Sequence, residues 1–421
     1  MMNLNENFIL RDKNLSNAGD TLNLARHRWY YYKEGFSPNL VKNAIDRLQL
    51  KAEDIIVDPF NGSGTVTLSS ALNGNSSIGV EVNPFTAFVS RTKVSVVDVD
   101  VFDKARESVL NSTNDKKSKL LNFSTFSENE KNKKWLFNKN VLNAFESAYQ
   151  TSKSFNNKEV KDLVKLILIT SAMENSNVRR DGKCLRYKNG WQDLSYDTNS
   201  FYKSLEKKFS LVREDLSVIN PDMQNPTIYC DDSRKYFSSS DENKFSLCIT
   251  SPPYLNTFDY TDIYRPELFL GEFVTSMKEL YNLRLRTIRS HIQAKWDEPV
   301  KNEFGILYEV AIKEILSKKE LLMNPNIPIM IQAYFEDMEI ILKGLKNKAK
   351  ENAELWLIVS TSAYANVEIP VDLIIGEIGN RIGWQLKEIG VLRNIRKRKT
   401  KYSPDIATLR ESVVIFKNSK K

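Results

Sequence analysis

The stretch SLCITSPPYLNTFD, residues 246–259, places a hydroxyl, two prolines and an aromatic ring directly after a run that predicts a buried strand. Prolines have no N–H for a sheet ladder, so the strand should end here. An exocyclic amine on a nucleobase is a poor nucleophile because its lone pair is delocalised into the ring. Hydrogen bonds from its N–H groups to the Ser251 Oγ and the Pro252 carbonyl would free that lone pair, and Pro253 would hold the turn rigid. Tyr254 could stack on the base once it is flipped out of a duplex; the alternative is a plain turn after a strand.

A second stretch, DPFNGSGT at residues 58–65, has the composition of a ligand-binding turn between a strand and a helix. Glycines let a ligand approach the backbone and meet the N-terminus of the following helix. The stretch lacks the lysine and the spacing of a P-loop, and Gly62-Ser63-Gly64 matches only the first half of the dinucleotide fingerprint. Glu81 follows Gly62 by 19 residues, at the end of the next predicted strand, where a carboxylate can accept hydrogen bonds from ribose hydroxyls. These features favour a nucleoside-type ligand over an ordinary turn with an exposed glutamate.

The stretch YCDDSRKYF, residues 229–237, predicts a third strand end. Asp231 or Asp232 could offer a carboxylate to an adenine amino group. Asp pairs also begin turns and cap helices, and a cap is the expected role of one of the two.

The elements predicted around these motifs are those of an α/β domain. Residues 54–57, 66–72 and 77–82 predict a strand, a helix and a second strand, and hence a right-handed crossover in a parallel sheet. Residues 101–225 predict a mainly helical insertion, with a buried helix at 161–175 and a glycine-containing loop at 179–191. Further on, the pattern predicts helices at 304–322, 332–345 and 371–383, a buried strand near 354–360, and two antiparallel closing strands at 384–392 and 411–417. We therefore expect three parts, namely 1–100 and 226–421 as the two pieces of a catalytic domain and 101–225 as the insertion between them.

The composition is that of a globular protein, with 421 residues, 41% hydrophobic and 27% charged. No run of about 18 uncharged apolar residues predicts a membrane span, and the N-terminus lacks the pattern of a signal peptide. Three widely spaced cysteines and two histidines predict neither disulfides nor a metal cluster. We expect a reduced, cytoplasmic protein without a bound metal.

The charge is unevenly distributed along the chain. There are 61 Lys and Arg against 53 Asp and Glu, a net charge of +8. The run RNIRKRKTK, residues 393–401, holds six cations, Arg396 and Arg398 among them, and no acid. Such a run suits a phosphate backbone; the alternative is a solvated tail.

The combination of DPFNGSGT, IGVEVNP and TSPPY resembles the amino-methylating DNA methyltransferases, which act on cytosine N4 or adenine N6. This resemblance implies an α/β fold, the Rossmann-like class I methyltransferase fold with a seven-stranded, mostly parallel sheet. It also implies S-adenosyl-L-methionine as the methyl donor and double-stranded DNA as the substrate. Ser251, Pro252, Pro253 and Tyr254 would be the catalytic residues. The residues implied for the donor site are Phe36, Ser37, Pro38, Asp58, Pro59, Phe60, Gly62, Ser63, Gly64, Thr65, Glu81, Asp231, Asp232 and Thr250.

The resemblance also bears on the target base. A leading serine in the catalytic tetrapeptide is typical of cytosine-N4 enzymes, whereas Asp or Asn is typical of adenine-N6 enzymes. Ser251 therefore favours cytosine N4. In this chain, however, the donor motif precedes the catalytic motif, and the commonest cytosine-N4 arrangement has the opposite order.

The region that would read the DNA sequence is expected within the insertion, at VRRDGKCLRYKNGW, residues 178–191. Arginines can read guanine edges bidentately, while lysines mostly hold phosphates. Its candidate contacts are Arg179, Arg180, Arg186 and Lys188. Stray surface charge is the alternative, and residues 255–325 are a rival location.

The sequence thus predicts a site-specific cytosine-N4 DNA methyltransferase that works by direct transfer to a flipped base, beside a cognate restriction endonuclease. No Pro-Cys dipeptide occurs in the chain, so the usual nucleophile of carbon-5 methylation is missing. Two alternatives stay open at this point. One is methylation of adenine N6, and the other is a catalytically idle module that binds nucleic acid.

Overall fold

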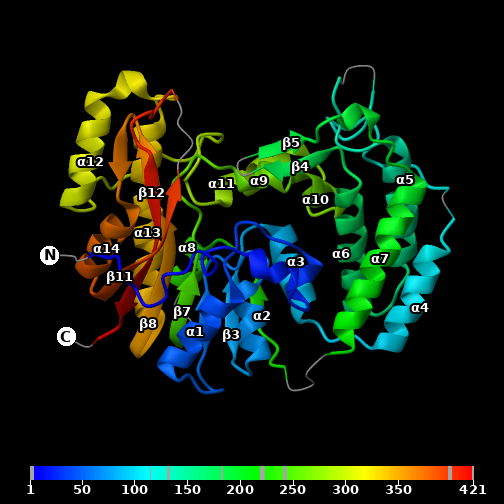
Figure 1. Ribbon diagram of the computed structural model, residues 1–421, viewed down its shortest axis with the longest axis horizontal. Coiled ribbons are helices and arrows are strands. Elements are labelled where there is room, and N and C mark those ends of the chain that lie inside the picture. The colour runs from blue at the N-terminus through cyan, green and yellow to red at the C-terminus, as the bar shows by residue number, and fades with distance from the viewer. Residues whose placement is uncertain are drawn as a thin grey trace.

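The computed structural model describes residues 4–113, 115–129, 133–181, 184–218, 223–239, 244–396 and 401–419, except for the side chain of Arg396. Figure 1 shows a central sheet, with a bundle of helices to its right and strands β11 and β12 at its left. Within the described residues, no helix is long and apolar enough to cross a membrane.

Among the described residues, eight strands form one sheet in the order β1-β11-β12-β8-β7-β2-β3-β6. Their bounds are β1 (Leu4–Asn5), β2 (Ile56–Asp58), β3 (Ser77–Val80), β6 (Thr227–Tyr229), β7 (Phe245–Thr250), β8 (Ala349–Ser360), β11 (Gln385–Arg396) and β12 (Thr408–Lys417). Strands β6, β3, β2, β7 and β8 are parallel, while β12 is antiparallel to both of its neighbours. The expected class I methyltransferase fold and the antiparallel closing pair are confirmed. The count of seven strands is corrected to eight, because Leu4 pairs with Ile389 and adds β1 to the edge.

Alternation along the central strands produces a three-layer arrangement. Ile56 and Val57 of β2 belong to hydrophobic clusters on opposite faces of the sheet, as do Leu247 and Cys248 of β7. One cluster includes side chains of α1 (Pro38–Leu48) and α2 (Thr65–Leu72). The other includes side chains of α8 (Ser233–Ser238), α12 (Ile306–Ser317), α13 (Ile327–Lys348) and α14 (Val371–Arg381). Strands buried on both faces explain the nearly continuous apolar runs in the sequence.

A third hydrophobic cluster builds the helical bundle at the right of Figure 1. It joins α3 (Pro84–Val94), α4 (Val99–Leu110), α5 (Lys139–Lys153), α6 (Lys158–Glu174) and α7 (Thr198–Leu216). Side chains from α9 (Tyr260–Ile263), α10 (Arg265–Leu270) and α11 (Met277–Arg286) belong to the same cluster. The segment after the catalytic motif therefore packs onto the helical bundle.

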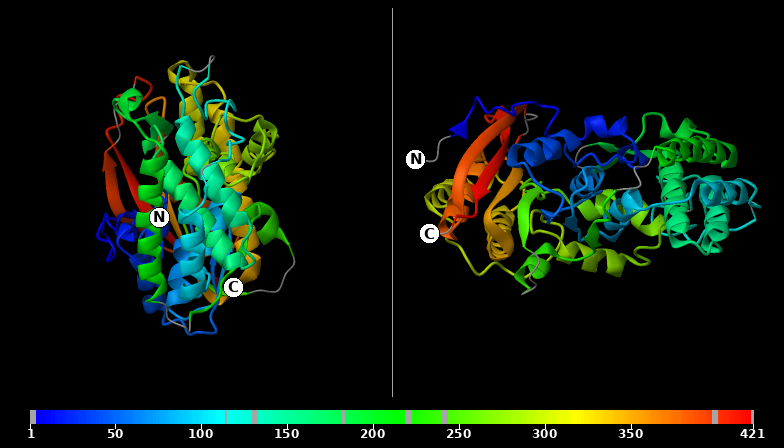
Figure 2. Two further views of the ribbon diagram at one scale, coloured as in Figure 1. Left: turned by 90° about the vertical axis from the view of Figure 1, so that its right-hand side faces the viewer. Right: turned by 90° about the horizontal axis from the view of Figure 1, so that it is seen from below.

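The loop expected at residues 179–191 is largely a β-hairpin. Strands β4 (Val178–Asp181) and β5 (Cys184–Tyr187) pair antiparallel, and a short 3₁₀ turn, η3 (Trp191–Asp193), follows. The remaining short elements are η1 (Gly19–Leu22), η2 (His27–Trp29), η4 (Lys319–Leu321), β9 (Ser362–Tyr364) and β10 (Val367–Ile369). The alternation of side chains along β4 places neighbouring arginines in different surroundings, which affects the DNA-contact predictions below. Figure 2 shows two further views of this arrangement.

Candidate active site

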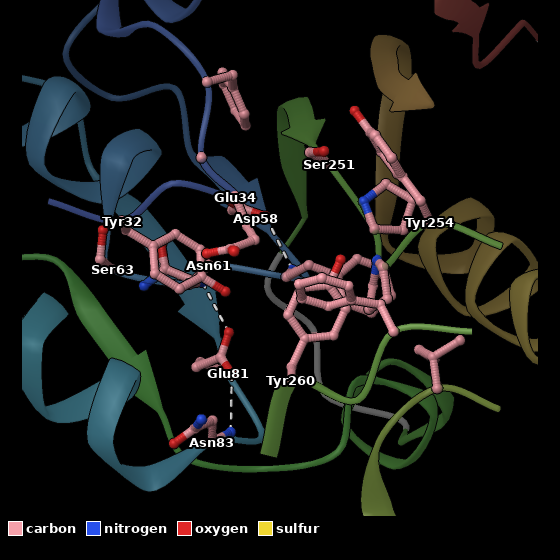
Figure 3. Close-up of a pocket in the computed structure, with 18 of the residues that line it drawn as sticks. Tyr32, Glu34, Asp58, Asn61, Ser63, Glu81, Asn83, Ser251, Tyr254 and Tyr260 are labelled. Carbon is pink, nitrogen blue, oxygen red and sulfur yellow. Dashed lines mark hydrogen bonds between the residues drawn. The ribbon is translucent and has the colours of Figure 1, made fainter. Parts of the chain in front are cut away.

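A cavity of about 480 Å³ lies where β2, β3 and β7 end. The chain runs outward from β2 to β3 and β6 on one side and from β7 to β8 on the other, so the order of the strands reverses here. Open α/β sheets bind their ligands at this position. Figure 3 shows Glu81 and Asn83 on one side of the cavity, with Ser251 and Tyr254 across from them.

The turn after β2 is held by its own first residue. The Oδ1 atom of Asp58 accepts hydrogen bonds from the backbone N–H of Phe60 at 2.9 Å and from the Thr250 hydroxyl at 2.6 Å. Gly62 has φ +48°, a conformation that suits glycine, and a Cβ there would lie 2.9 Å from the Tyr32 ring. Asp58 thus joins the donor turn to the strand that carries the catalytic motif.

Glu81, directly after β3, is oriented by the same turn. Its Oε2 accepts the N–H of Gly62 at 2.8 Å, and its Oε1 accepts the N–H of Asn83 at 2.8 Å. A carboxylate has about four acceptor sites, so each oxygen can accept a further hydrogen bond. Glu81 thus has acceptor sites left for a pair of neighbouring hydroxyls, and its contact with a ribose stays a prediction.

Three acidic side chains of the cavity are buried (Asp58) or partly buried (Glu34 and Glu81), at a cost to their charged forms. Burial raises the pKa of Asp58 to about 7, and the nearby Glu81 adds to the shift. Burial also raises the pKa of Glu81 and that of Glu34, whose carboxylate accepts a hydrogen bond from the Tyr264 hydroxyl. A cationic ligand would relieve this cost, because it would pair with the ionised acids.

The tetrapeptide predicted to be catalytic, residues 251–254, directly follows β7, and all four of its residues line the cavity. Tyr254 donates its hydroxyl hydrogen to Glu411 Oε1 at 2.6 Å. The structure thus brings the tetrapeptide to one wall of the space that the donor turn borders on the other side.

Most of the predicted donor residues line the cavity, and five do not. Those that do are Phe36, Asp58, Pro59, Phe60, Gly62, Ser63, Thr65, Glu81 and Asp232. Ser37, Pro38, Gly64, Asp231 and Thr250 are absent from the wall. Their local contacts explain why.

Ser37 caps α1 by accepting the N–H of Asn39 at 3.0 Å and also contacts Asp20, while Pro38 is the first residue of that helix. Gly64, with φ +86°, is the N-cap of α2. Thr250 acts through Asp58, as described above. The contacts of these four residues in the structure shape the elements around the cavity, and their direct contact with the donor stays a prediction.

The aspartate pair divides as the sequence suggested. Asp232 caps α8 by accepting the N–H of Arg234 at 3.0 Å, and it also pairs with the Arg234 guanidinium at 2.7 Å. The Asp231 side chain is 47% exposed and lies 3.4 Å from Arg286. Asp231 stays the predicted partner of an adenine amino group, because its carboxylate is the less engaged of the two.

The candidate DNA contacts on the hairpin occupy different surroundings. Arg179 is exposed, and Arg186 is 55% exposed while paired with Asp181 at 2.7 Å. Arg180 instead points inward, where it pairs with the fully buried Glu267 and lies over the Tyr264 ring at 4.7 Å. The DNA contact predicted for Arg180 is therefore corrected to a packing role.

Lys188 is partly buried. Its Nζ donates to the Glu174 carbonyl at 3.1 Å and to the Tyr196 hydroxyl at 3.2 Å, so it too serves the fold. In the C-terminal run, Arg398 and the side chain of Arg396 lie outside the described residues.

Several residues of the site were not among those predicted from the sequence. Tyr32 and Glu34 come from the segment before α1, Tyr260 from α9, and Arg393 and Glu411 from the closing strands. Lys93 of α3 donates to Ser63 Oγ at 3.4 Å and to the Tyr30 carbonyl at 3.1 Å, and burial lowers its pKa to about 7.

Residues 8–91 match a family model for N6/N4 methyltransferases, described as DNA methylase. The type II methyltransferase M.BsoBI of Geobacillus stearothermophilus is 27% identical, over 94% of this chain and 86% of its own length. The type II methyltransferase M.AvaI of a Nostoc species is 26% identical, over 87% of this chain and 80% of its own. These comparisons support the resemblance to the amino-methylating DNA methyltransferases that the motifs indicated.

Solved structures are more distant from this methyltransferase. A SAM-dependent methyltransferase from Methanosarcina mazei aligns with a TM-score of 0.30 and 8% identity, over 90% of this chain and 98% of its own. TrmN from Thermus thermophilus aligns with a TM-score of 0.29 and 8% identity, over 90% of this chain and 48% of its own. Because these scores are low, the fold rests on the strand order of the chain itself.

S-adenosyl-L-methionine is the cofactor of the methyltransferase. The residues present fit this molecule, because its sulfonium and ammonium groups are cationic and the cavity holds the acids Glu34, Asp58 and Glu81. Glycine at position 62 lets the turn pack against the Tyr32 ring at the cavity wall, since a side chain there would meet that ring. When bound, the cofactor supplies a methyl group that is electrophilic because it is attached to a positively charged sulfur.

Proposed function

We propose that this S-adenosylmethionine-dependent methyltransferase modifies cytosine N4 at a specific site in double-stranded DNA, by direct transfer to a flipped base. We further propose that it works in the cytoplasm, on DNA of the nucleoid, as the protective partner of a restriction endonuclease. The observation that carries the proposal is the position of Ser251, on the cavity wall opposite Glu81.

The chemistry of this wall suits an exocyclic amine. Ser251 Oγ and the Pro252 carbonyl are acceptors for the two N–H groups, and the prolines hold them at a fixed spacing. Such acceptors favour the pyramidal amine of the transition state over the planar amine of the free base. Glu34, Asp58 and Glu81 would hold the donor across the cavity, so that donor and amine meet in the space between the two walls.

The burial of the nearby Cys248 also supports direct transfer of the methyl group, without a cysteine adduct of the base. Cys248 is fully buried within β7, and burial raises the pKa of its thiol well above the usual range. Ser251 and Pro252 contribute hydrogen-bond acceptors. We therefore propose no covalent link between the protein and the base.

The alternative is methylation of adenine N6, which presents a similar amine. It is favoured by the order of the motifs, because the donor turn precedes the catalytic tetrapeptide in this chain. The two targets are separated by identifying the product nucleoside.

The first experiment incubates the purified protein with S-adenosyl-L-methionine and unmodified duplex DNA, followed by digestion and mass spectrometry of the nucleosides. N4-methylcytosine is the expected product. N6-methyladenine would keep the chemistry and overturn the choice of base. If neither base is methylated on several unmodified DNAs, the methyl-transfer proposal fails and an idle nucleic-acid-binding module takes its place.

Ser251→Ala tests the role of the serine. We expect the single-turnover rate to fall by about a hundredfold, the scale of losing one preorganised hydrogen bond in a transition state. Donor affinity, measured by calorimetry, should change by less than about threefold, because Ser251 faces the amine rather than the donor. Equal losses in rate and in donor affinity would contradict this assignment.

A further inference from the structure

The hydroxyl of Tyr254 donates a hydrogen bond to an ion pair that joins the two closing strands, β11 and β12. Glu411 of β12 is 2% exposed; its Oε1 accepts the hydrogen of Tyr254 at 2.6 Å, and its Oε2 accepts Arg393 Nε at 2.6 Å. Arg393 and Glu411 face each other in the β11–β12 register. All three side chains line the cavity. The ion pair therefore belongs to the same wall as the catalytic tetrapeptide.

A carboxylate can only accept hydrogen bonds, so this contact has one direction. Arg393 donates to the other oxygen of the same carboxylate, so both oxygens of Glu411 accept a hydrogen bond. Burial, followed by the neighbouring Glu411, raises the pKa of Tyr254 well above its usual range, so the phenol keeps its hydrogen at neutral pH. That hydrogen is committed to Glu411, and the lone pairs of the phenol oxygen are left to accept.

Ser251 lines the same cavity as Tyr254, three residues before it in the chain. Because the hydrogen of Tyr254 is committed to Glu411, a hydrogen bond between the two hydroxyls would run from Ser251 to Tyr254. The hydrogen of Ser251 would thereby be directed away from the substrate. Both lone pairs of Ser251 Oγ are then free to accept an N–H of the target amine.

We propose that Glu411, held by Arg393, is a positioning residue that sets the direction of the hydrogen-bond chain Ser251→Tyr254→Glu411 and so makes the Ser251 oxygen an acceptor for the target amine. This inference rests on the proposed function. It adds to that function a residue 157 positions beyond Tyr254 in the chain, whose role is separate from donor binding and from base stacking.

Glu411→Gln reverses the chain while keeping the size of the side chain. The guanidinium of Arg393 has only donors, so the amide oxygen of Gln would face Arg393 and its NH₂ group would face Tyr254. The phenol oxygen would accept from that NH₂, and its hydrogen would turn to Ser251. The Ser251 oxygen would then receive the phenol hydrogen in competition with the target amine.

The test compares single-turnover methyl transfer for the wild type, Glu411→Gln, Tyr254→Phe and the double variant, at saturating donor and DNA. We expect Glu411→Gln to lose about tenfold to a hundredfold in rate, the scale of one misdirected hydrogen bond. Tyr254→Phe should lose less, because without the phenol nothing competes for Ser251. The double variant should match Tyr254→Phe, which means that the second change restores activity to Glu411→Gln. Losses that add or multiply in the double variant would overturn the proposal.

Glu354→Gln is the matched control. Glu354 is 2% exposed, accepts Trp356 Nε1 at 2.8 Å and pairs with Lys387, so it copies the aromatic and cationic contacts of Glu411 away from the cavity wall. It should affect thermal stability without selective loss of rate, and Tyr254→Phe should not rescue it. If Glu411→Gln does not fold, as judged by donor calorimetry, Glu411→Asp keeps the charge and shortens the reach. Its smaller loss should again disappear when Tyr254→Phe is added, and its persistence would overturn the proposal.

The wild type separates the two levels of inference. If the wild type methylates neither cytosine nor adenine in DNA, the proposed function fails. If the wild type is active and the double variant shows no rescue, the function stands and only the role of Glu411 fails.

Discussion

The carboxylate of Asp58 is buried where its negative charge is unfavourable. A cation bound in the cavity would stabilise that charge. The same carboxylate fixes the donor turn through Phe60 and Thr250, yet burial and Glu81 raise its pKa to about 7. A cationic donor would favour the ionised form. The same residue thus joins the geometry of the turn to the electrostatics of the cavity.

Asp58→Asn tests the cost of burying this charge through the pH dependence of stability. The folded pKa is about 7 and the unfolded value is near 4, so between these values the folded state binds the extra proton. Stability from Asp58 is therefore present at low pH and falls as pH rises towards 7. Without donor, the variant should melt on the order of 2–4 °C above the wild type at pH 8, with no difference near pH 4.

Asp54→Asn is the control, measured by the same thermal unfolding. Asp54 lies just before the same strand, and its pKa is lowered, first by the hydrogen bond from Ser246. Its stabilising contribution is present above the unfolded pKa and is lost as pH falls through the folded pKa. At pH 8 the Asp54→Asn variant should be less stable than the wild type. A difference of the same sign in both variants would contradict the assignment for Asp58.

At the scale of elements, the sequence predicts those strands, turns and helices that are determined by residues close together in the chain. The apolar run before Thr250, the glycines after Asp58 and the closing strands all have local signals, and the strand order confirms the fold they imply. Contacts between distant segments have no such signal. Tyr254 meets Glu411 because β12 pairs with β8, and Arg180 turns inward because Glu267 is buried on α10. The turn at residues 58–65 could thus be predicted from the sequence. The contact between Tyr254 and Glu411 could not, because it joins segments that are distant in the chain.

The N-terminus of α2 offers a test at this scale. Gly64 has φ +86°, and a Cβ there would lie 2.9 Å from the Cβ of Ser90. Gly74, just after the same helix, has φ +79° and nothing within 4 Å of such a Cβ. Gly74→Ala should cost about 1–2 kcal/mol from the backbone conformation alone, and Gly64→Ala about 1–3 kcal/mol more from overpacking.

Denaturant unfolding of the two variants measures this difference, and donor calorimetry should show weaker binding only for Gly64→Ala. The extra loss arises because Ser90 must move and Asn61, whose amide donates to Ser90 Oγ at 2.7 Å, moves with it. Equal costs in the two variants would show that the contact with Ser90 has no energetic effect.

At the scale of the whole molecule, the proposed function requires the cavity and the excess positive charge to act on the same DNA. The cavity wall carries acids, whereas the net charge of +8 is spread elsewhere, partly in the run at 393–401. The acids suit the small cationic donor, and the basic residues suit the phosphate backbone. Arg393 connects the two regions, because it begins the basic run and pairs with Glu411 in the cavity wall.

The salt dependence of DNA binding can separate backbone contacts from base contacts. The logarithm of affinity falls with that of salt concentration by about 0.9 for each phosphate neutralised. We expect the double variant Arg396→Ala/Arg398→Ala to bind all duplexes more weakly and to reduce this slope by about 2.

The double variant Arg179→Ala/Arg186→Ala should instead lose about 1–3 kcal/mol of discrimination per base contact, because the exposed hairpin arginines are the predicted base readers. Fluorescence anisotropy with the mapped methylation site and a scrambled duplex measures both quantities. Lys42→Ala/Lys158→Ala, which removes two exposed, ion-paired lysines from α1 and α6, controls for charge alone. If the hairpin variant binds both duplexes with an equal loss, recognition lies elsewhere, with residues 255–325 as the next region to test.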